Sequence, residues 1–241
     1  MTNVRAATAV LLIAASVPLA LSTTADAHHA VLRFNLEEMV LTADRIFVGR
    51  CVAIDVTTDV IAKGRLPVTR YTFDVEQVLK GDVPRRFTFT ELGQPPAPAK
   101  KGPSVHGVLA TPALLIHGMS TYAIGSRMLL FLTPNYTEGK LTYPVGLEQG
   151  AFLVEDTDGQ VMVRNNLNNA ALFDAPYNSR ALANGEARII FPDAGDTITA
   201  DAGLSAAARG LASRRGALPL APMVEMVGKI QAAHSAKGGR R

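Results

Sequence analysis

The chain has 241 residues, of which 48% are hydrophobic and 19% charged, and its formal net charge at pH 7 is +3. This apolar content excludes a wholly disordered chain, and the one cysteine, Cys51, excludes an internal disulfide framework. The small net charge argues against a protein built wholly for nucleic acid. The length suits one medium domain with an additional segment.

The first 27 residues have the pattern of a cleaved, Sec-type export signal. Arg5 supplies a positive start, Ala6–Ser22 is apolar or small, and Ala25-Asp26-Ala27 fits the small-x-small cleavage rule. We therefore predict a mature chain that begins at His28 and is periplasmic or secreted. The alternative is a retained N-terminal anchor. No later segment reaches about 18 uncharged apolar residues, so no membrane span is predicted after cleavage.

The mature chain begins with a predicted helix and a long strand. Residues 35–43 repeat apolar side chains at helical spacing, and Asn35 is a suitable N-cap. Residues 45–58 are rich in Ile and Val and predict a strand, with Gly49 as a bulge or bend. A loop is predicted at 63–67, where glycine and proline occur together.

Two further strands are predicted at 68–79 and 85–91 because polar and apolar side chains alternate along them. The aromatic members of these alternating faces are Tyr71, Phe73, Phe87 and Phe89. They suit either the core of a barrel or an exposed stacking platform for bases, and the alternation favours the core. Short turns join these runs, which favours an antiparallel meander.

The second half of the predicted sheet follows a proline-rich loop at 93–104. Strand candidates lie at 128–133, 141–145, 151–155 and 160–164. The sequence Asp156-Thr157-Asp158-Gly159 predicts a hairpin turn between the last two. It also resembles the start of a calcium loop, but the later ligands of that loop are missing.

Two helices are predicted near the C-terminus. Their apolar faces are Leu204, Ala207, Ala208 and Leu211 in the first, and Met223, Met226, Val227 and Ile230 in the second. Residues 205–241 carry seven Lys and Arg residues against Glu225 alone. This basic tail is either a solvated terminus or a patch that touches anionic lipid, polysaccharide or nucleic acid. We predict a β-domain at 28–165 and a loop-rich, helical, basic segment at 166–241.

Four stretches, taken together and in order, carry a resemblance to a known family. They are Ala43–Arg50 (ADRIFVGR), Tyr71–Gly81 (YTFDVEQVLKG), Ile124–Leu132 (IGSRMLLFL) and Val145–Phe152 (VGLEQGAF). The chain resembles an uncharacterised family of secreted bacterial proteins, which is similar to the netrin/tissue-inhibitor-of-metalloproteinase (TIMP-like) class. The resemblance covers roughly residues 36–155 and implies a small antiparallel OB-fold-like β-barrel. With the helices predicted above, we expect a mainly β fold in which this barrel has a short N-terminal helix and a helical C-terminal tail.

The resemblance has two departures. Ser126 stands where the family usually has Glu, and residues 93–104 are proline-rich where the family tends to be glycine-rich. True metalloproteinase inhibitors use an N-terminal cysteine and several disulfides, and this chain has neither. Protease inhibition is therefore suggested by fold analogy alone.

The best candidate for a metal site lies at the predicted mature N-terminus. The α-amine and imidazole of His28 together can chelate copper(II), and His106 or His117 would complete a three-nitrogen site. The alternative is that these histidines occupy ordinary loop positions. Cys51 lies in an apolar run, which favours a small buried side chain over a reactive thiol.

The sequence holds no G-x-S-x-G elbow, H-E-x-x-H motif, C-x-x-C pair or phosphate-binding loop. We therefore expect an exported, non-enzymatic binding or scaffolding module for a protein, a glycan or another envelope component. The alternatives are a metal-binding protein that uses His28, and a protease-inhibitor-like module.

Overall fold

The computed structural model describes residues 33–95, 114, 116, 118–170, 172–173, 205–213 and 216–238. The predicted export signal and the three histidines of the predicted metal site, His28, His106 and His117, lie outside these described residues. Among the helices that the structure describes, none is both long and apolar enough to cross a membrane.

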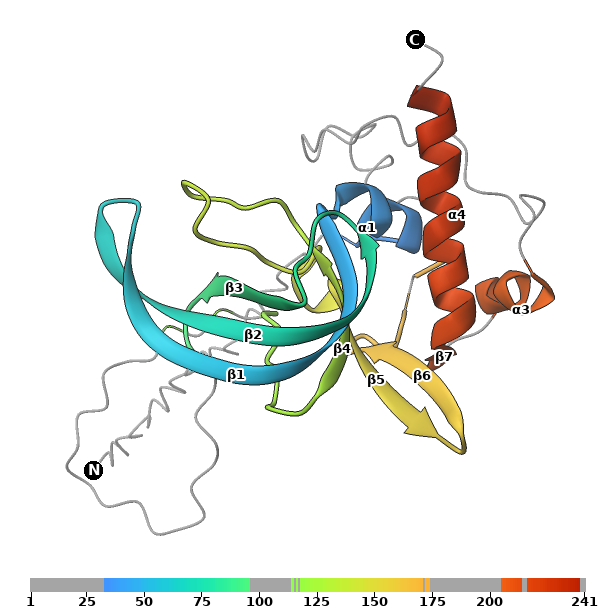
Figure 1. The fold of residues 1–241 in the computed structure, drawn as a ribbon, viewed down its shortest axis with the longest axis horizontal. Coiled ribbons are helices and arrows are strands. Elements are labelled where there is room, and N and C mark those ends of the chain that lie inside the picture. The colour runs from blue at the N-terminus through green and yellow to red at the C-terminus, as the bar shows by residue number, and fades with distance from the viewer. Residues whose placement is uncertain are drawn as a thin grey trace, which may run out of the picture. The chain divides into compact units, whose positions relative to one another are not determined.

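The fold is mainly β, with one antiparallel sheet and three α-helices in the described residues (Figure 1). The strands are β1 (Arg45–Ile61), β2 (Gly64–Lys80), β3 (Arg86–Leu92), β4 (Arg127–Leu132), β5 (Ala151–Thr157), β6 (Gln160–Asn165) and β7 (Leu218–Pro219). The helices are α1 (Leu36–Thr42), α3 (Ala206–Arg209) and α4 (Leu220–Gly238), with 3-10 turns η1 (Leu147–Gly150) and η2 (Gly210–Ser213).

The strand order is β3-β2-β1-β4-β5-β6-β7, and every neighbouring pair is antiparallel. Strands β1, β2 and β3 follow one another in the predicted meander. Strand β4 then returns after a long connection to lie beside β1. Three consecutive strands with a fourth beside the first make a Greek key.

The prediction of a closed barrel is not confirmed, because the described strands form an open sheet whose end strands are β3 and β7. The predicted strand at 141–145 makes only isolated bridges, between Leu141 and Tyr136 and between Pro144 and Leu132. Pro144 has no backbone N–H, so it weakens a ladder at this point. One backbone hydrogen bond, from Thr142 N to Thr90 O at 2.9 Å, links this segment to β3.

The ribbon of β1 and β2 is longer than predicted and strongly curved (Figure 1). The predicted loop at 63–67 is wrong, since Gly64 pairs with Ile61 and Pro67 pairs with Thr58. Only Ala62 and Lys63 form the turn, both with positive φ (47° and 70°). A two-residue hairpin turn with positive φ at both residues has a backbone twist that fits the twist of the flanking strands.

Gly49 lies at a register shift in the β1–β2 pairing, as predicted. A Cβ at this position would lie 2.9 Å from the Asp74 backbone oxygen. Glycine therefore lets the bent ribbon bring its two strands together at this point.

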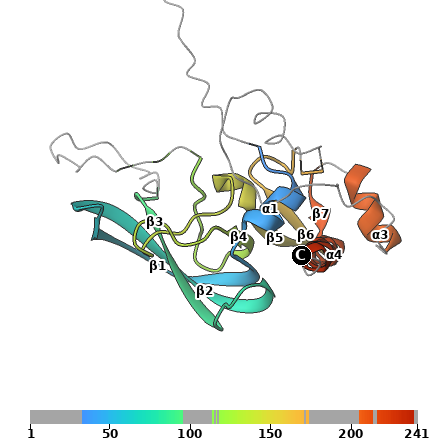
Figure 2. The same cartoon turned by 90° about the horizontal axis from the view of Figure 1, so that it is seen from above.

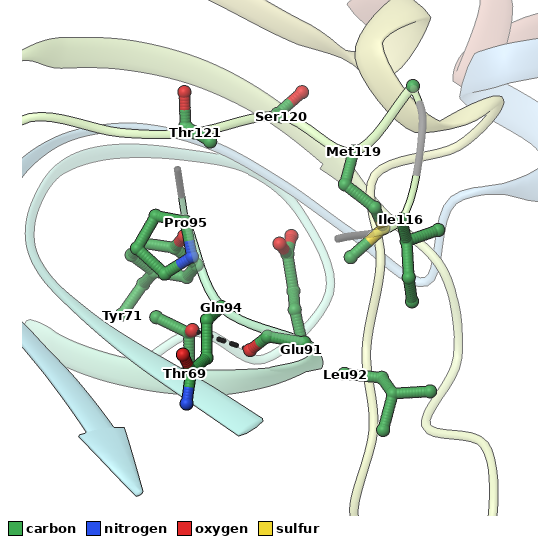
Figure 3. Close-up of a pocket in the computed structure, with 12 residues that line it drawn as sticks. Thr69, Tyr71, Glu91, Leu92, Gln94, Pro95, Ile116, Met119, Ser120 and Thr121 are labelled. Carbon is green, nitrogen blue, oxygen red and sulfur yellow. Dashed lines mark hydrogen bonds between the residues drawn. The ribbon is translucent and has the colours of Figure 1, made fainter. Parts of the chain in front are cut away.

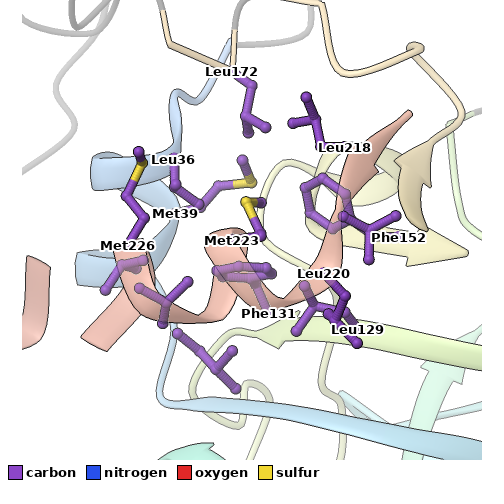
Figure 4. Close-up of a cluster of buried hydrophobic side chains, with 14 of the residues drawn as sticks. Leu36, Met39, Leu129, Phe131, Phe152, Leu172, Leu218, Leu220, Met223 and Met226 are labelled. Atoms are coloured by element: carbon purple, nitrogen blue, oxygen red, sulfur yellow. The ribbon is translucent and has the colours of Figure 1, made fainter. Parts of the chain in front are cut away.

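The sheet buries apolar side chains on both faces. One core includes Ile46, Val48, Leu129, Phe131 and Phe152 and packs against α1 and α4 (Figure 4). The other core includes Phe47, Cys51, Tyr71, Phe73, Phe89, Tyr122 and Leu130. Strand β4 contributes to both, which explains the continuous apolar run of the predicted strand at 128–133.

Helices α1 and α4 contact each other beside β6 (Figure 2). A capping box between Asn35 and Glu38 begins α1, which confirms the predicted N-cap. The predicted apolar face of the second C-terminal helix is confirmed, since Met223, Met226, Val227 and Ile230 are all buried. The first C-terminal helix is shorter than its pattern predicted, and its chain continues as η2.

Candidate functional site

A cavity of about 250 Å³ opens beside the ends of β2 and β3 (Figure 3). Its walls come from these two strands, from the chain that follows β3, and from the segment before β4. The lining residues are Thr69, Tyr71, Glu91, Leu92, Gly93, Gln94, Pro95, Ile116, Gly118, Met119, Ser120 and Thr121. This volume is just below the range that drug-sized ligands occupy, so the cavity suits a small ligand.

Glu91 reaches the cavity because of the two-residue repeat of β3. Phe87, Phe89 and Glu91 share one face of the strand, and this face turns toward the aromatic core. Glu91 is directly opposite Thr69 on β2 and is only 2% exposed. In Figure 3 its side chain extends toward the segment that carries Met119 and Ser120.

Tyr122 contacts both the carboxyl group of Glu91 and the rings of the aromatic core. Its hydroxyl donates to Glu91 Oε1 over 3.4 Å. Its ring meets the Tyr71 ring edge to face, with 4.6 Å between centroids, and the Phe73 ring in the same way at 5.5 Å. These contacts fix the phenol, so the position of its hydroxyl beside Glu91 is set by packing.

Backbone and hydroxyl contacts hold the floor of the site. The Thr69 hydroxyl donates to Gly93 O at 2.8 Å, and Gly93 N donates to Pro67 O at 2.8 Å (Figure 3). Gly93 has a φ of 95°, and a Cβ there would lie 2.6 Å from Leu114 O. The turn after β3 is therefore fixed by a glycine that other residues replace only with strain.

Burial dominates the electrostatics of the site. It raises the pKa of Glu91 well above its ordinary value, and the hydrogen bond from Tyr122 opposes this only in part. Burial also raises the pKa of Tyr122, and the nearby Glu91 charge adds to that effect. The pKa of Tyr71 is raised chiefly by burial as well. None of the twelve described lining residues is Lys, Arg or His.

The site can therefore present a carboxyl group to a small ligand. In its neutral form the group donates one hydrogen bond, and in its charged form it accepts bonds and attracts a cation. The described lining supplies no histidine, lysine or cysteine that would act with Glu91 as a base or a nucleophile.

A second hollow lies on the opposite face of the β-ribbon. It is lined by Arg50, Asp74, Val75, Glu76, Arg85 and Arg86. Arg86 Nε donates to Asp74 Oδ1 at 2.9 Å, and Arg50 Nη2 lies 3.8 Å from Glu76 Oε1. Acidic groups thus already engage two of these guanidinium groups, and the hollow is an array of cross-strand charge pairs.

The structure decides several of the other candidates. Cys51 is fully buried, and burial raises its pKa, which confirms a small core side chain. Tyr71, Phe73 and Phe89 are buried in the core, and the half-buried Phe87 packs against them, so the four residues form no exposed stacking platform. Asp158 and Gly159 form the hairpin turn between β5 and β6, as predicted.

The predicted metal site stays a prediction, because His28, His106 and His117 lie outside the described residues. Within the described residues, no group of three or more His, Cys, Asp or Glu side chains is placed to hold a metal ion.

Sequence reasoning missed Glu91 as a site residue, although the signal was present. The alternation that put Phe87 and Phe89 on one face also puts Glu91 there, two residues later. A charged residue in register with a core face is informative because carboxylates are almost never fully buried without a partner.

Comparisons of this chain with protein-family models, with curated proteins and with solved structures find no match.

Proposed function

We propose that this protein is an exported, non-enzymatic binding module and that the Glu91 cavity is its ligand site. One observation carries the proposal: a buried carboxyl group lies at the wall of a cavity whose described lining has no basic residue. A buried carboxyl normally has a partner of opposite charge or a set of hydrogen bonds. Among the described residues, the one hydrogen bond that reaches its side chain is the long contact from Tyr122.

We also propose that the strands β1–β5 are a partly open relative of the OB-fold barrel, in line with the TIMP-like resemblance. The Greek-key order of β1–β4, with β5 beside β4, supports this proposal. The hydrogen bond from Thr142 to Thr90 supports it as well, because it joins the end strand β3 to the chain after β4. The export signal at residues 1–27 is the ground for placing the protein in the periplasm or outside the cell.

The proposal that the cavity binds a ligand is tested by blocking its opening. Thr121 is exposed and lines the cavity, so Thr121→Trp should cover its opening with an indole ring. Thr88→Trp makes the same change at an exposed position of β3 outside the cavity, and it serves as the control. Neutral, cationic and anionic fragments are screened by the shifts of the backbone amide NMR signals of Glu91, Met119 and Thr121.

The proposal requires that at least one fragment class shifts these signals in the natural protein and in Thr88→Trp. The same fragments should leave the signals unmoved in Thr121→Trp. A screen in which no fragment moves the cavity signals, or in which Thr121→Trp binds as the natural protein does, would overturn it.

A further inference from the structure

The charge of the lining limits the kind of ligand that the Glu91 cavity accepts. Glu91 is the one acidic side chain among the twelve described lining residues, and none of the twelve is basic. An anionic ligand would therefore meet a carboxyl group with no compensating cation in this lining. A cationic ligand would supply the positive charge that the twelve described lining residues do not, and a buried ion pair forms only where both partners are present.

The groups that surround Glu91 favour its charged form once a cation is present. Tyr122 Oη donates to Oε1 over 3.4 Å, so one oxygen already has a donor suited to a carboxylate. The Thr69 hydroxyl donates to Gly93 O and also interacts with the side chain of Tyr71, so it is already engaged by the wall of the cavity. Tyr71 borders the cavity, and an aromatic ring attracts an ammonium group over its face.

Among the residues that the structure describes, the titratable groups that interact with Glu91 are phenols. Tyr71 lies on β2, Tyr122 on the segment before β4, and Tyr143 on the segment after β4; all three interact electrostatically with Glu91. Burial raises the pKa of each phenol, so all three are neutral near pH 7. Glu91 is therefore the group of this cluster that changes charge in the ordinary pH range.

We propose that the cavity binds a small ligand through a primary ammonium group that pairs with the Glu91 carboxylate, and that Glu91 releases its proton to solvent as the ligand binds. The inference rests on the proposed function, because it names the ligand class of the same cavity. A primary ammonium has three donors, and the two carboxylate oxygens of Glu91 can accept from them. The cavity of about 250 Å³ restricts the rest of the ligand to a small body.

The proposal predicts a defined pH dependence. While Glu91 is protonated in the empty protein, each unit of rising pH makes its proton easier to remove, so ammonium binding tightens about tenfold per pH unit. Binding no longer tightens with pH once Glu91 is ionised in the ligand-free protein as well. A neutral ligand that hydrogen-bonds to the protonated acid would show no such gain with pH.

The test uses n-butylammonium chloride and n-butanol, which have nearly the same shape and differ in charge. Each is titrated into the mature protein at several pH values, and binding is followed by the backbone amide NMR signals of the cavity. The carbon-13 signal of the Glu91 side-chain carboxyl reports its protonation directly. Glu91→Gln removes the charge, and Glu155→Gln makes the same change at an exposed position of β5.

The expected result is that n-butylammonium binds with the pH dependence above and moves the Glu91 carboxyl signal to its ionised position. Glu91→Gln should weaken this binding at least about tenfold, as a lost ion pair in a dry site would, and Glu155→Gln should leave it unchanged. Binding of n-butylammonium without pH dependence, or with a Glu91 signal that does not move, would overturn the ammonium inference.

The two proposals fail in different ways. If n-butanol moves the cavity signals and n-butylammonium does not, the ammonium inference is wrong and the cavity remains a ligand site. If neither compound moves the cavity signals while the fragment screen finds only neutral or anionic binders there, the ammonium inference is again wrong by itself. If no compound of any class moves those signals, both proposals are wrong.

Discussion

The Tyr122 hydroxyl lies 3.4 Å from Oε1 of Glu91, at the point where the aromatic core of the β1–β4 strands meets the cavity. Tyr122 is 5% exposed and Glu91 is 2% exposed, so the pair is almost wholly removed from water. A fully packed apolar core would avoid the energetic cost of burying these two polar groups. Changes to either side chain should therefore alter both the free energy of unfolding and the ionisation of Glu91 in the cavity.

Replacing Glu91 by glutamine should change how stability depends on pH. Burial raises the pKa of Glu91 in the folded state above its ordinary value of 4.5. The folded protein therefore keeps a proton that the unfolded chain has lost, and the free energy of unfolding falls as pH rises above that value. The slope from this one group reaches about 1.4 kcal/mol per pH unit. Glu91→Gln should lack this contribution.

The measurement is urea unfolding of the natural protein and Glu91→Gln between about pH 5 and about pH 8. The difference in unfolding free energy between the two should move in favour of Glu91→Gln as pH rises. Glu155→Gln, exposed on β5, is the control and should run parallel to the natural protein. Parallel curves for Glu91→Gln would show that Glu91 is not a buried acid.

Tyr122→Phe should raise the pKa of Glu91 further. The hydrogen bond from Tyr122 lowers this pKa, in opposition to the larger effect of burial, and phenylalanine keeps the ring but removes the donor. The loss should also cost about 1 kcal/mol of unfolding free energy, as for a typical buried hydrogen bond. The carbon-13 titration of the Glu91 carboxyl measures the shift. An unchanged or lower pKa would contradict the contact between the two side chains.

The sequence predicted the elements whose burial is regular and missed those decided by distant contacts. The capped helix at 35–43, the meander of 45–91 and the buried strand at 128–133 all follow from local periodicity. The loop predicted at 63–67 was wrong because Gly64 and Pro67 are turn formers by type. Their pairing with Ile61 and Thr58 depends on a two-residue turn of Ala62 and Lys63, which carries no glycine signal.

The site was partly visible in the sequence. The position of Glu91 on the aromatic face follows from alternation, but its neighbours do not. Tyr122 lies 31 residues away along the chain, in a stretch where no helix or strand was predicted. A closed barrel was expected from the resemblance, yet closure depends on whether segment 141–145 pairs along its length. Pro144 limits that pairing to isolated bridges.

Asn35→Ala should destabilise the protein by about 1 kcal/mol, because it removes the N-cap of α1. The Asn35 side chain accepts from Glu38 N at 2.8 Å, and Glu38 Oε2 accepts from Asn35 N at 2.9 Å. Urea unfolding measures the loss. Asn166→Ala, at an exposed turn position after β6, should change stability much less. Equal effects would show that the capping box is not what stabilises this end of α1.

Met223→Ala should cost about 2–5 kcal/mol, the range for a large buried side chain cut to alanine. Met223 is fully buried where α4 packs on the sheet, next to Met39 and Phe131 in the same core (Figure 4). Ala232→Ser, on the exposed side of α4, is the control and should cost only a few tenths of a kcal/mol. A small loss for Met223→Ala would mean that α4 contributes little to the core.

Cys51 should react slowly with the thiol reagent DTNB in the folded protein and fast once the protein is unfolded. Its side chain is fully buried in the aromatic core, and burial raises its pKa, so both access and the thiolate fraction are reduced. The reaction is followed by absorbance with and without urea. Because opening must precede reaction, the core-weakening Met223→Ala should speed the folded-state reaction, whereas Ala232→Ser should leave its rate unchanged. Rapid labelling of the natural protein without urea would contradict the burial of this thiol.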